Sequence, residues 1–315
     1  MIDYKGFIEQ NFFIKNKKGQ VVPFIFNETQ NYYYDLLLKE YETLEGVREN
    51  ILKFRQPGFS SLIDGIFTTD FIFASEKKIA SISGQIISHK DEETKVLFRR
   101  VDFFLSCYFD KAQIDRKKYL KTDTSGYLES FSGAELFIGT AGAKTLGRGG
   151  TLQNLHWSEV GFYPNTEILN AKDLITGAEQ QVADSVGKIF RESTGNISGD
   201  FFSDEYEAGK SDRADFKSRF LGWWLHKEYN RTPPIGWDVP SYYQDIRDKY
   251  AITDEQCYWH FVKTDQLRDK KKMREYPTDD TEAFLMGGDQ YFDSDSLLWY
   301  HNNTKEPMKE HLIYV

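Results

Sequence analysis

The chain has 315 residues, of which 40% are hydrophobic, and its formal net charge is −9 at pH 7. This length suits one large domain or a domain with a smaller companion, and the acidic balance argues against a protein that coats nucleic acid with a basic surface. No apolar run is long enough to cross a bilayer, the N-terminus lacks the features of a secretory signal, and the distant Cys107 and Cys257 indicate neither a disulfide framework nor a zinc site. A reducing setting inside a cell fits these features best.

The first informative stretch is an apolar strip at residues 21–26, which is followed by Gln30. Apolar side chains then recur at helical spacing over residues 32–40, so we predict a helix there. A glutamine at the start of such a helix is placed to hold an adenine ring through its amide, with Phe24 against the base. The alternative is an ordinary helix start with an exposed glutamine.

Residues 51–62 have the pattern of a turn between a buried strand and a helix, and we predict the helix over residues 61–73. A triphosphate needs free backbone N–H groups, a cation, a hydroxyl for Mg²⁺ and a helix N-terminus. Gly58 lets the backbone approach the phosphates, and Ser60 or Ser61 is able to cap the helix and reach a metal.

The cations of this turn stand in unusual positions. The common phosphate-loop motif reads G-x-x-x-x-G-K-[ST], whereas here Phe59 occupies the lysine position and Lys53 the position of the first glycine. A lysine at the front of the loop can still turn its ammonium toward the phosphates, and Arg55 adds a second positive charge. The alternative is a Pro-Gly turn followed by a serine-capped helix.

The next segments indicate the fold class. Residues 78–83 alternate like a strand, and the apolar positions over residues 85–104 predict a long helix. Residues 127–131 and 135–140 have the signature of a β-hairpin. The order strand, phosphate turn, helix, strand, helix is typical of a parallel sheet with right-handed crossovers, so we predict an α/β fold.

The glycine-rich segment 139–150 lacks the spacing of a second phosphate loop, and we interpret it as a mobile arm that presents Arg148. The strand predicted over residues 152–159 ends in Glu159, at the carboxyl edge where ligands bind in sheets of this class. In an ATPase such a glutamate polarises the attacking water, and a preceding aspartate helps to hold Mg²⁺ through its water shell. Ser158 replaces that aspartate here and brings no charge. The alternative is an edge glutamate in a surface ion pair.

Residues 189–196 repeat the pattern of a strand that ends in small polar residues. At such a strand end, Thr194 and Asn196 are placed to sense the γ-phosphate and to pass its loss to a neighbouring element. The alternative is a simple Gly-Asn turn.

In this order the segments resemble the ATPase half of a large terminase subunit, the DNA-packaging motor of tailed phages. The resemblance covers nearly the whole chain and rests on the order and spacing of several short motifs. The matching residues are 23–24, Gln30, 53–60, 148–149, 156–160, 193–196, 220–224, 275–278 and 282–284.

The resemblance implies an additional-strand P-loop NTPase core over residues 1–200, with a mainly parallel sheet flanked by helices and an N-terminal adenine-motif segment. Residues 201–315 would form a smaller subdomain II and a linker toward a nuclease domain that the chain lacks. Residues 311–315 resemble the opening of the first strand of that domain. We therefore expect a truncated chain or a split gene product that does not cut DNA by itself.

The resemblance also implies a role for each matching residue. The implied catalytic residues are Glu159, Arg55 and, acting in the ATP site of a neighbouring subunit, Arg148. The implied ATP-binding residues are Phe24, Gln30, Lys53, Gln56, Gly58, Phe59, Ser60 and Ser61. Three residues would couple hydrolysis to motion, namely Thr194, Gly195 and Asn196. Mg²⁺ would be held by Ser60 and, through water, by Ser158.

The implied activity is Mg²⁺-dependent ATP hydrolysis that drives DNA into a preformed capsid, in the host cytoplasm and away from membranes. ATP and Mg²⁺ are the implied cofactors. The implied partners are double-stranded DNA, the portal protein, the small terminase subunit and further copies of the chain in a ring on the procapsid. An arginine supplied by a neighbour raises phosphoryl-transfer rates by roughly 10³–10⁵, so an isolated subunit is expected to hydrolyse ATP slowly.

Two other functions remain open. A helicase-like translocase shares the same core but needs a second full motor domain, for which the chain has too few predicted strands. A non-catalytic nucleotide-binding scaffold that docks on the portal or the small terminase is favoured by Ser158 and Phe59, because both depart from a usual ATPase site. A comparison of ATP turnover with that of Glu159→Ala discriminates the scaffold from the motor.

Overall fold

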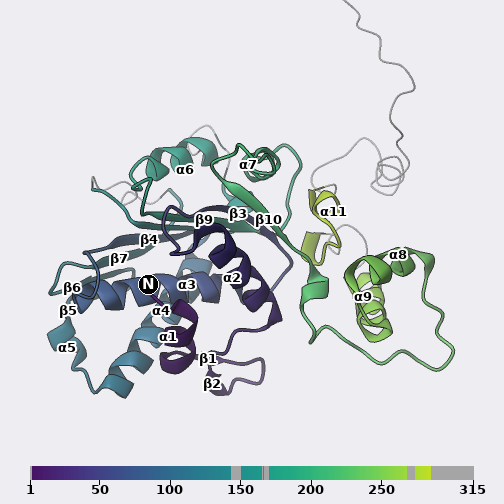
Figure 1. The fold of residues 1–315 in the computed structure, drawn as a ribbon, viewed down its shortest axis with the longest axis horizontal. Helices are drawn as coiled ribbons and strands as arrows, with labels where there is room; N and C mark the ends of the chain where they lie inside the picture. Colours follow the sequence, from purple (N-terminus) through teal and green to yellow (C-terminus); the bar gives the residue numbers. More distant parts are fainter. Residues whose placement is uncertain (1, 143–149, 165, 167–169, 268–273, 285–315) are drawn as a thin grey trace, which may run out of the picture.

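The computed structural model describes residues 2–142, 150–164, 166, 170–267 and 274–284, and an eight-stranded sheet lies at its centre (Figure 1). The six neighbouring strands from β10 to β7 run parallel, which confirms the predicted mainly parallel α/β fold. The other two continue the sheet antiparallel at one edge. In spatial order the strands are β10 (Lys217–Leu221), β3 (Arg48–Lys53), β9 (Lys188–Ser193), β8 (Asn154–Ser158), β4 (Ser83–Ser88), β7 (Glu135–Thr140), β6 (Tyr127–Ser130) and β5 (Leu120–Thr124).

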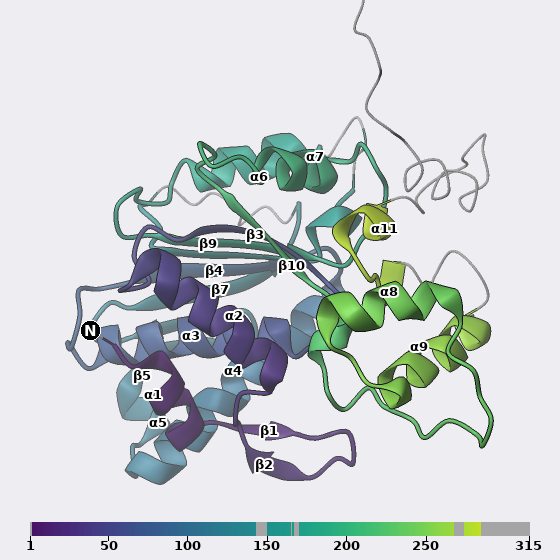
Figure 2. The same ribbon diagram turned by 45° about the vertical axis from the view of Figure 1, so that its right-hand side comes forward.

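Helices cover both faces of this sheet, as Figures 1 and 2 show. One face carries α1 (Tyr4–Asn11), α2 (Glu28–Tyr41), α3 (Phe59–Ser75) and α4 (Asp91–Ala112). The opposite face carries α6 (Ala171–Glu179) and α7 (Phe201–Ala208). The remaining short elements of the core are the hairpin of β1 (Phe13–Lys15) and β2 (Val21–Pro23), α5 (Arg116–Tyr119) and the 3-10 turn η1 (Val160–Phe162). Within the described ranges, no helix combines the length and apolar character needed to cross a membrane.

Because both faces of the sheet are covered, its central strands place apolar side chains on both sides. In β3, Ile51 packs into the core beneath α3, whereas Leu52 packs into the core beneath α6 and α7. Ile86 and Ile87 of β4 divide between the two cores in the same way. The central strands are therefore buried on both faces, although they carry charged and polar residues as well as apolar ones.

This two-sided burial explains the segment that the sequence led us to assign wrongly. The strand predicted over residues 78–83 is wrong, since residues 77–80 form turns and bends and β4 begins only at Ser83. The helix predicted over residues 85–104 is correct only from Asp91 onward. Because β4 is buried on both faces, its two apolar residues, Ile86 and Ile87, are adjacent and do not alternate, so periodicity alone does not separate them from the start of a buried helix.

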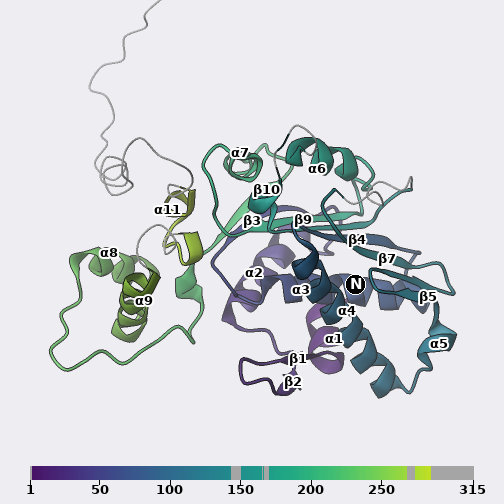
Figure 3. The ribbon, with the colours of Figure 1, turned by 180° about the vertical axis from the view of Figure 1, so that it is seen from behind.

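After β10 the chain leaves the sheet and forms a smaller lobe, which lies beside the core in Figures 1 and 3. Its elements are η2 (Trp223–Leu225), α8 (Ser241–Tyr250) and α9 (Asp254–Leu267). They enclose an aromatic core around Trp223 and Tyr229, and Phe54, the first residue after β3, belongs to that core. The short helix α11 (Asp280–Phe284) then packs against α7 through Phe284.

The core extends past residue 200, where we predicted its end. Helix α7 follows that residue and packs on β3, and β10 pairs with β3 in parallel register from Lys217 to Leu221. The smaller lobe therefore begins after Leu221. The resemblance had led us to assign residues 220–224 as a whole to the smaller subdomain.

Candidate active site

The turn after β3 adopts a conformation suited to an anion. Gln56 and Gly58 both have left-handed backbone dihedrals, with φ of 62° and 75°, on either side of Pro57. Turns of this kind form concave nests of backbone N–H groups that bind phosphates. A non-glycine residue in the left-handed region costs about 1–2 kcal/mol, so the surrounding structure must hold Gln56 there.

Neighbouring elements fasten this turn from two sides. On the α2 side, Asn27 Nδ2 donates to the carbonyl of Pro57 at 3.0 Å, and Gln30 Nε2 donates to the carbonyl of Gly58 at 2.7 Å. On the side of the smaller lobe, the Arg55 N–H donates to the carbonyl of Glu275 at 2.8 Å. These bonds occupy backbone groups on the protein side of the turn and fix its shape.

Gln30 and Phe24 lie elsewhere than the adenine-binding prediction expected. Gln30 is buried and closes a capping box with Asn27 at the start of α2. The Phe24 ring is buried in the core and stacks on Phe104 at a centroid distance of 5.6 Å. In this structure Gln30 positions the turn after β3 and Phe24 packs against α4, and neither side chain is among those that line the cavity described below.

Lys53, at the end of β3, meets carboxylates from two other strands. Its Nζ lies 2.7 Å from Glu159 Oε1 and 3.0 Å from Glu192 Oε2. The lysine side chain is only 5% exposed and that of Glu192 is fully buried. Burial alone would lower the pKa of the Lys53 ammonium, but the charges of Glu159 and Glu192 raise it above its ordinary value. Lys53 is therefore a fixed positive charge at the carboxyl edge of the sheet.

Two serine hydroxyls converge on the same buried carboxylate. Ser60 Oγ and Ser158 Oγ each donate to Glu192 Oε1 at 2.8 Å. The prediction that Ser60 or Ser61 caps helix α3 is wrong, since the N-cap residue is Gly58 and, within the described chain, no side chain bonds the N–H groups of the first turn. Those N–H groups, at the positive end of the helix dipole, are thus left for a ligand.

Glu192 was missed by the reasoning from sequence. It lies in β9, where the parallel register places it opposite Ser158. In the sequence, a carboxylate near the end of a predicted strand was a signal that could have identified it. The charged neighbours Arg191 and Glu192 directly after apolar residues were a second signal, and the structure buries both of them. Arg191 points to the opposite face, where it pairs with Glu179 of α6.

Glu159 has a left-handed backbone, with φ of 58°, directly after β8. Its Oε2 accepts a bond of 3.1 Å from the Thr194 N–H, and the Thr194 hydroxyl lies 3.4 Å away. A non-glycine residue held in this strained conformation is typical of functional sites. The predicted coupling residue Thr194 thus touches the predicted catalytic carboxylate.

The next two predicted coupling residues connect this edge to the last described segment of the chain. Asn196 Nδ2 donates to the Gly161 carbonyl at 2.6 Å, and Arg274 Nη1 donates to Asn196 Oδ1 at 3.2 Å. Gly195 packs so closely on α11 that an added Cβ would lie 2.2 Å from the Ala283 carbonyl oxygen. The strand end after Glu192 is therefore in direct contact with α11 and with the segment that precedes it.

The other predicted residues divide between the cavity and the core. Arg55 is 58% exposed and pairs with Glu275 at 3.0 Å, while Ser61 lines the cavity. The Phe59 ring is buried against Tyr33, so only its backbone N–H, in the first turn of α3, is available to a phosphate. Arg148 lies outside the described residues.

A cavity of about 660 Å³ opens beside the phosphate turn. Besides Lys53 its lining includes six cationic residues, namely Lys15, Lys17, Arg55, Lys90, Arg100 and Arg274. The lining carboxylates are Glu93 and Glu159. Volumes of about 300–1,000 Å³ are usual for ligand sites, and a strongly positive lining suits a polyanion.

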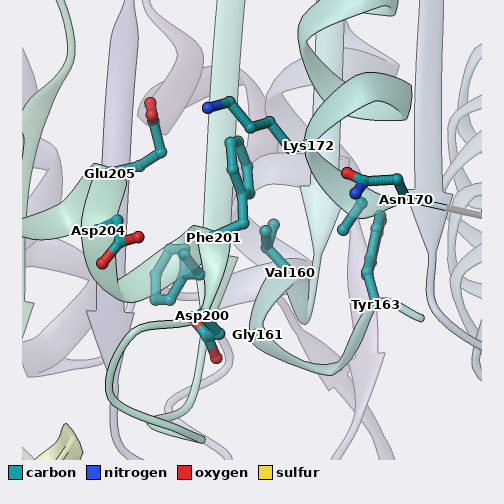
Figure 4. A pocket seen from close by; sticks show the side chains of 11 residues that line it. Val160, Gly161, Tyr163, Asn170, Lys172, Asp200, Phe201, Asp204 and Glu205 are labelled. Carbon is teal, nitrogen blue, oxygen red and sulfur yellow. The ribbon is translucent and has the colours of Figure 1, made fainter. Parts of the chain in front are cut away.

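A smaller cavity of about 210 Å³ lies between η1, α6 and α7 (Figure 4). Its lining carries the carboxylates of Asp200, Asp204 and Glu205 against the single cation Lys172. This acidic lining would repel phosphates. Charge therefore favours the larger cavity, and not this one, as the place for a polyanion.

The residues present fit a Mg²⁺–nucleotide. Mg²⁺ in such sites is bound through few protein oxygens together with the phosphates and water. The Ser60 hydroxyl stands in the first turn of α3 and borders the cavity, with Ser158 and the ionised Glu192 behind it. Among the described residues there is no group of three or more His, Cys, Asp or Glu side chains that could cage a metal without phosphates.

Comparisons with known proteins add the fold relationship. No family model matches the chain, and none of the curated proteins compared with it matches. The ATPase domain of the large terminase of Thermus phage P74-26 matches at a TM-score of 0.46 and 15% identity, over 79% of this chain and 97% of that one. A mutant of that domain matches at 0.45 and 14%, over 79% and 98%.

The large terminase of bacteriophage HK97 matches more extensively. The TM-score is 0.57 at 18% identity, over 90% of this chain and 55% of the HK97 protein. The chain thus corresponds to about half the length of that relative. At 18% identity, this structural match shows a common fold and no more. It confirms, for the fold, the resemblance inferred from the sequence motifs. The chain therefore has the fold of a phage large terminase over nearly all of its length.

Proposed function

We propose that this chain is a Mg²⁺-dependent ATPase that drives double-stranded DNA into a preformed capsid. The observation that carries this proposal is the convergence of Lys53 and Glu159 beside a phosphate turn, in a basic cavity of about 660 Å³. The fold shared with the HK97 large terminase supports the packaging role.

The site favours a defined exchange of partners when ATP binds. In this structure the Lys53 ammonium is held by Glu159 and Glu192. Phosphates on the turn and on the first N–H groups of α3 compete for that ammonium. As Lys53 turns to the phosphates, the Glu159 carboxylate is released to orient and deprotonate the attacking water. Binding of the substrate thus frees the base.

The remaining positive charge comes from other parts of the molecule. Arg55 is largely exposed and can leave Glu275 for the phosphates, and Arg148 of a neighbouring copy would complete the site. When bound, Mg²⁺ neutralises developing charge on the β- and γ-phosphates, and Ser60 and, through water, Ser158 would hold it. Within this chain, Glu159 would orient the attacking water.

The bond between Thr194 and Glu159 supports a route from chemistry to motion. Release of the γ-phosphate changes the position of Glu159, and the N–H of Thr194 follows it. Gly195 and Asn196 then transmit the shift to α11 and Arg274, and so to the smaller lobe. The DNA contacts are expected to be mainly to phosphates, hence insensitive to sequence and weakened by salt.

The proposed setting is a ring of copies on the portal of a procapsid, with a small terminase subunit, in the host cytoplasm. The test is ATP turnover in the presence of portal-bearing procapsids and linear double-stranded DNA. Wild type should hydrolyse ATP, and Glu159→Ala should lose at least about 100-fold of the rate, the usual contribution of a general base. Equal and negligible turnover in both proteins would instead support a nucleotide-binding scaffold.

A further inference from the structure

The strand that carries the catalytic glutamate lacks the carboxylate that usually precedes it. Ser158 occupies that place at the end of β8. We propose that Glu192, on the neighbouring strand β9, supplies the missing negative charge and positions Ser60 and Ser158 for Mg²⁺. This inference rests on the proposed ATPase function and adds a residue to the metal side of the site.

The strand register brings Glu192 to the required place. In the parallel pairing of β8 with β9, Ser158 lies directly opposite Glu192. Neighbouring strands are about 4.8 Å apart, and the longer glutamate side chain crosses that gap toward β8. Its Oε1 accepts the Ser158 hydroxyl at 2.8 Å. The negative charge is therefore carried by β9 instead of β8, at the same edge of the sheet.

The bond from Ser60 is the second step of the argument. A serine hydroxyl that ligates a cation needs an acceptor for its own proton, so that an oxygen lone pair faces the metal. Glu192 Oε1 is that acceptor, at 2.8 Å from Ser60 Oγ. Ser60 is in the first turn of α3 and borders the cavity, so a cation bound in the cavity would be within reach of its oxygen.

The surroundings of Glu192 keep it ionised and immobile. Its side chain is fully buried, Lys53 lies 3.0 Å from Oε2, and His156 Nε2 lies 3.4 Å from Oε1. The Lys53 ammonium at 3.0 Å and the two serine hydroxyls that donate to Oε1 offset the cost of burying a charged carboxylate. A buried carboxylate that accepts from both hydroxyls fixes the positions of the two serine oxygens relative to a bound cation.

The competing interpretation is that Glu192 only balances the charge of Lys53. The two interpretations differ in what happens to Mg²⁺. A positioning residue behind a metal ligand typically changes metal affinity by about 10- to 100-fold when it is removed. A charge-balancing residue would change stability and nucleotide affinity equally with and without Mg²⁺.

The experiment measures the affinity of a fluorescent, non-hydrolysable ATP analogue for the full chain, in Mg²⁺ and in EDTA. For Glu192→Gln we expect the gain in affinity due to Mg²⁺ to fall about tenfold or more, with little change in EDTA. Mn²⁺ binding in the presence of the analogue, followed by electron paramagnetic resonance, should weaken by the same factor.

The decisive variant places the carboxylate on β8 instead of β9. Ser158→Asp combined with Glu192→Gln should restore the Mg²⁺ dependence, and it keeps one carboxylate in the site if Glu192→Gln alone folds poorly. Full Mg²⁺ dependence in Glu192→Gln, or no recovery in the folded double variant, would overturn this inference while leaving the ATPase proposal intact. A wild-type protein that binds no analogue in either buffer would overturn both.

Discussion

The Nζ atom of Lys53 lies 2.7 Å from Oε1 of Glu159, although 106 positions separate the two residues. Lys53 ends β3, Glu159 follows β8, and only β9 lies between these strands in the sheet. Parallel strands end at one edge, so the strand order itself brings the side chains together. The site is therefore a property of the sheet as a whole rather than of the loop alone.

Replacing Lys53 by methionine should destabilise the fold, because it leaves Glu192 buried without its cation. Breaking a buried pair from one side costs about 3–5 kcal/mol, as measured by urea unfolding. Lys78→Met is the control, since the pair of Lys78 with Glu76 is at the surface and contributes about 0–1 kcal/mol. Adding Glu192→Gln to Lys53→Met should recover part of the loss, and equal losses in the two single variants would contradict the burial argument.

Gly195→Ala should push the end of β9 away from α11. The added Cβ would lie 2.2 Å from the carbonyl oxygen of Ala283, a backbone atom that cannot rotate aside. Overpacking of this kind costs about 1–3 kcal/mol in the free energy of unfolding. Gly177→Ala, in the interior of α6 with open space around it, should instead stabilise by up to about 1 kcal/mol. Shifts of the same sign in both variants would argue against close packing at Gly195.

Arg274→Gln should weaken the stimulation of ATP turnover by DNA more than it weakens ATP binding. Arg274 Nη1 reaches Asn196 Oδ1 at 3.2 Å, so its loss removes one link between β9 and the segment before α11. The measurement is the ratio of turnover with and without linear DNA, and we expect it to fall several-fold. Arg213→Gln, at an exposed position outside the cavity, is the control. A ratio that stays at the wild-type value in Arg274→Gln would remove Arg274 from the coupling route.

His226 should make the fold sensitive to mild acid. It packs beside Phe54 and Tyr229, and burial lowers the pKa of its imidazole below the ordinary value of about 6.5. The unfolded chain then binds the proton more tightly, so the free energy of unfolding falls as pH drops from about 6.5 through the folded pKa. Each pH unit over which the two states differ by one proton corresponds to about 1.4 kcal/mol.

The measurement for His226 is urea unfolding between about pH 5 and 8, the range in which histidine side chains usually change their charge. His226→Gln should show a shallower loss of stability toward pH 5 than wild type. A pH profile identical to that of wild type would show that His226 titrates alike in the folded and unfolded chain. His89, which also has a lowered pKa from burial, remains in both proteins and cancels in the comparison.

The sequence was sufficient to predict the α/β class, because the order of strands and helices can be inferred from local patterns. Lys53 and Glu159 stand at strand ends, and strand ends meet in a parallel sheet. Glu192 escaped prediction for the opposite reason. Its role depends on which strand lies next to β8, and a single sequence does not state that order.

For two other segments, the local pattern in the sequence did not show the tertiary role that the structure gives them. Gln30 follows an apolar strip, as an adenine-binding residue would, but the amide is used by the capping box of α2 and by the Gly58 carbonyl. Residues 85–88 are buried and contain only two apolar residues, Ile86 and Ile87, so their periodicity did not separate a strand from a helix. Packing partners, not propensity, decided both cases.

The central claim is that Lys53 and Glu159 serve one triphosphate and exchange partners when it binds. The most direct test is the dissociation constant of a non-hydrolysable ATP analogue for Glu159→Gln, with Glu45→Gln, an exposed carboxylate outside the cavity, as control. Removing the charge that holds Lys53 should tighten binding several-fold, while the control stays at the wild-type value. Unchanged or weaker binding in Glu159→Gln would contradict the account.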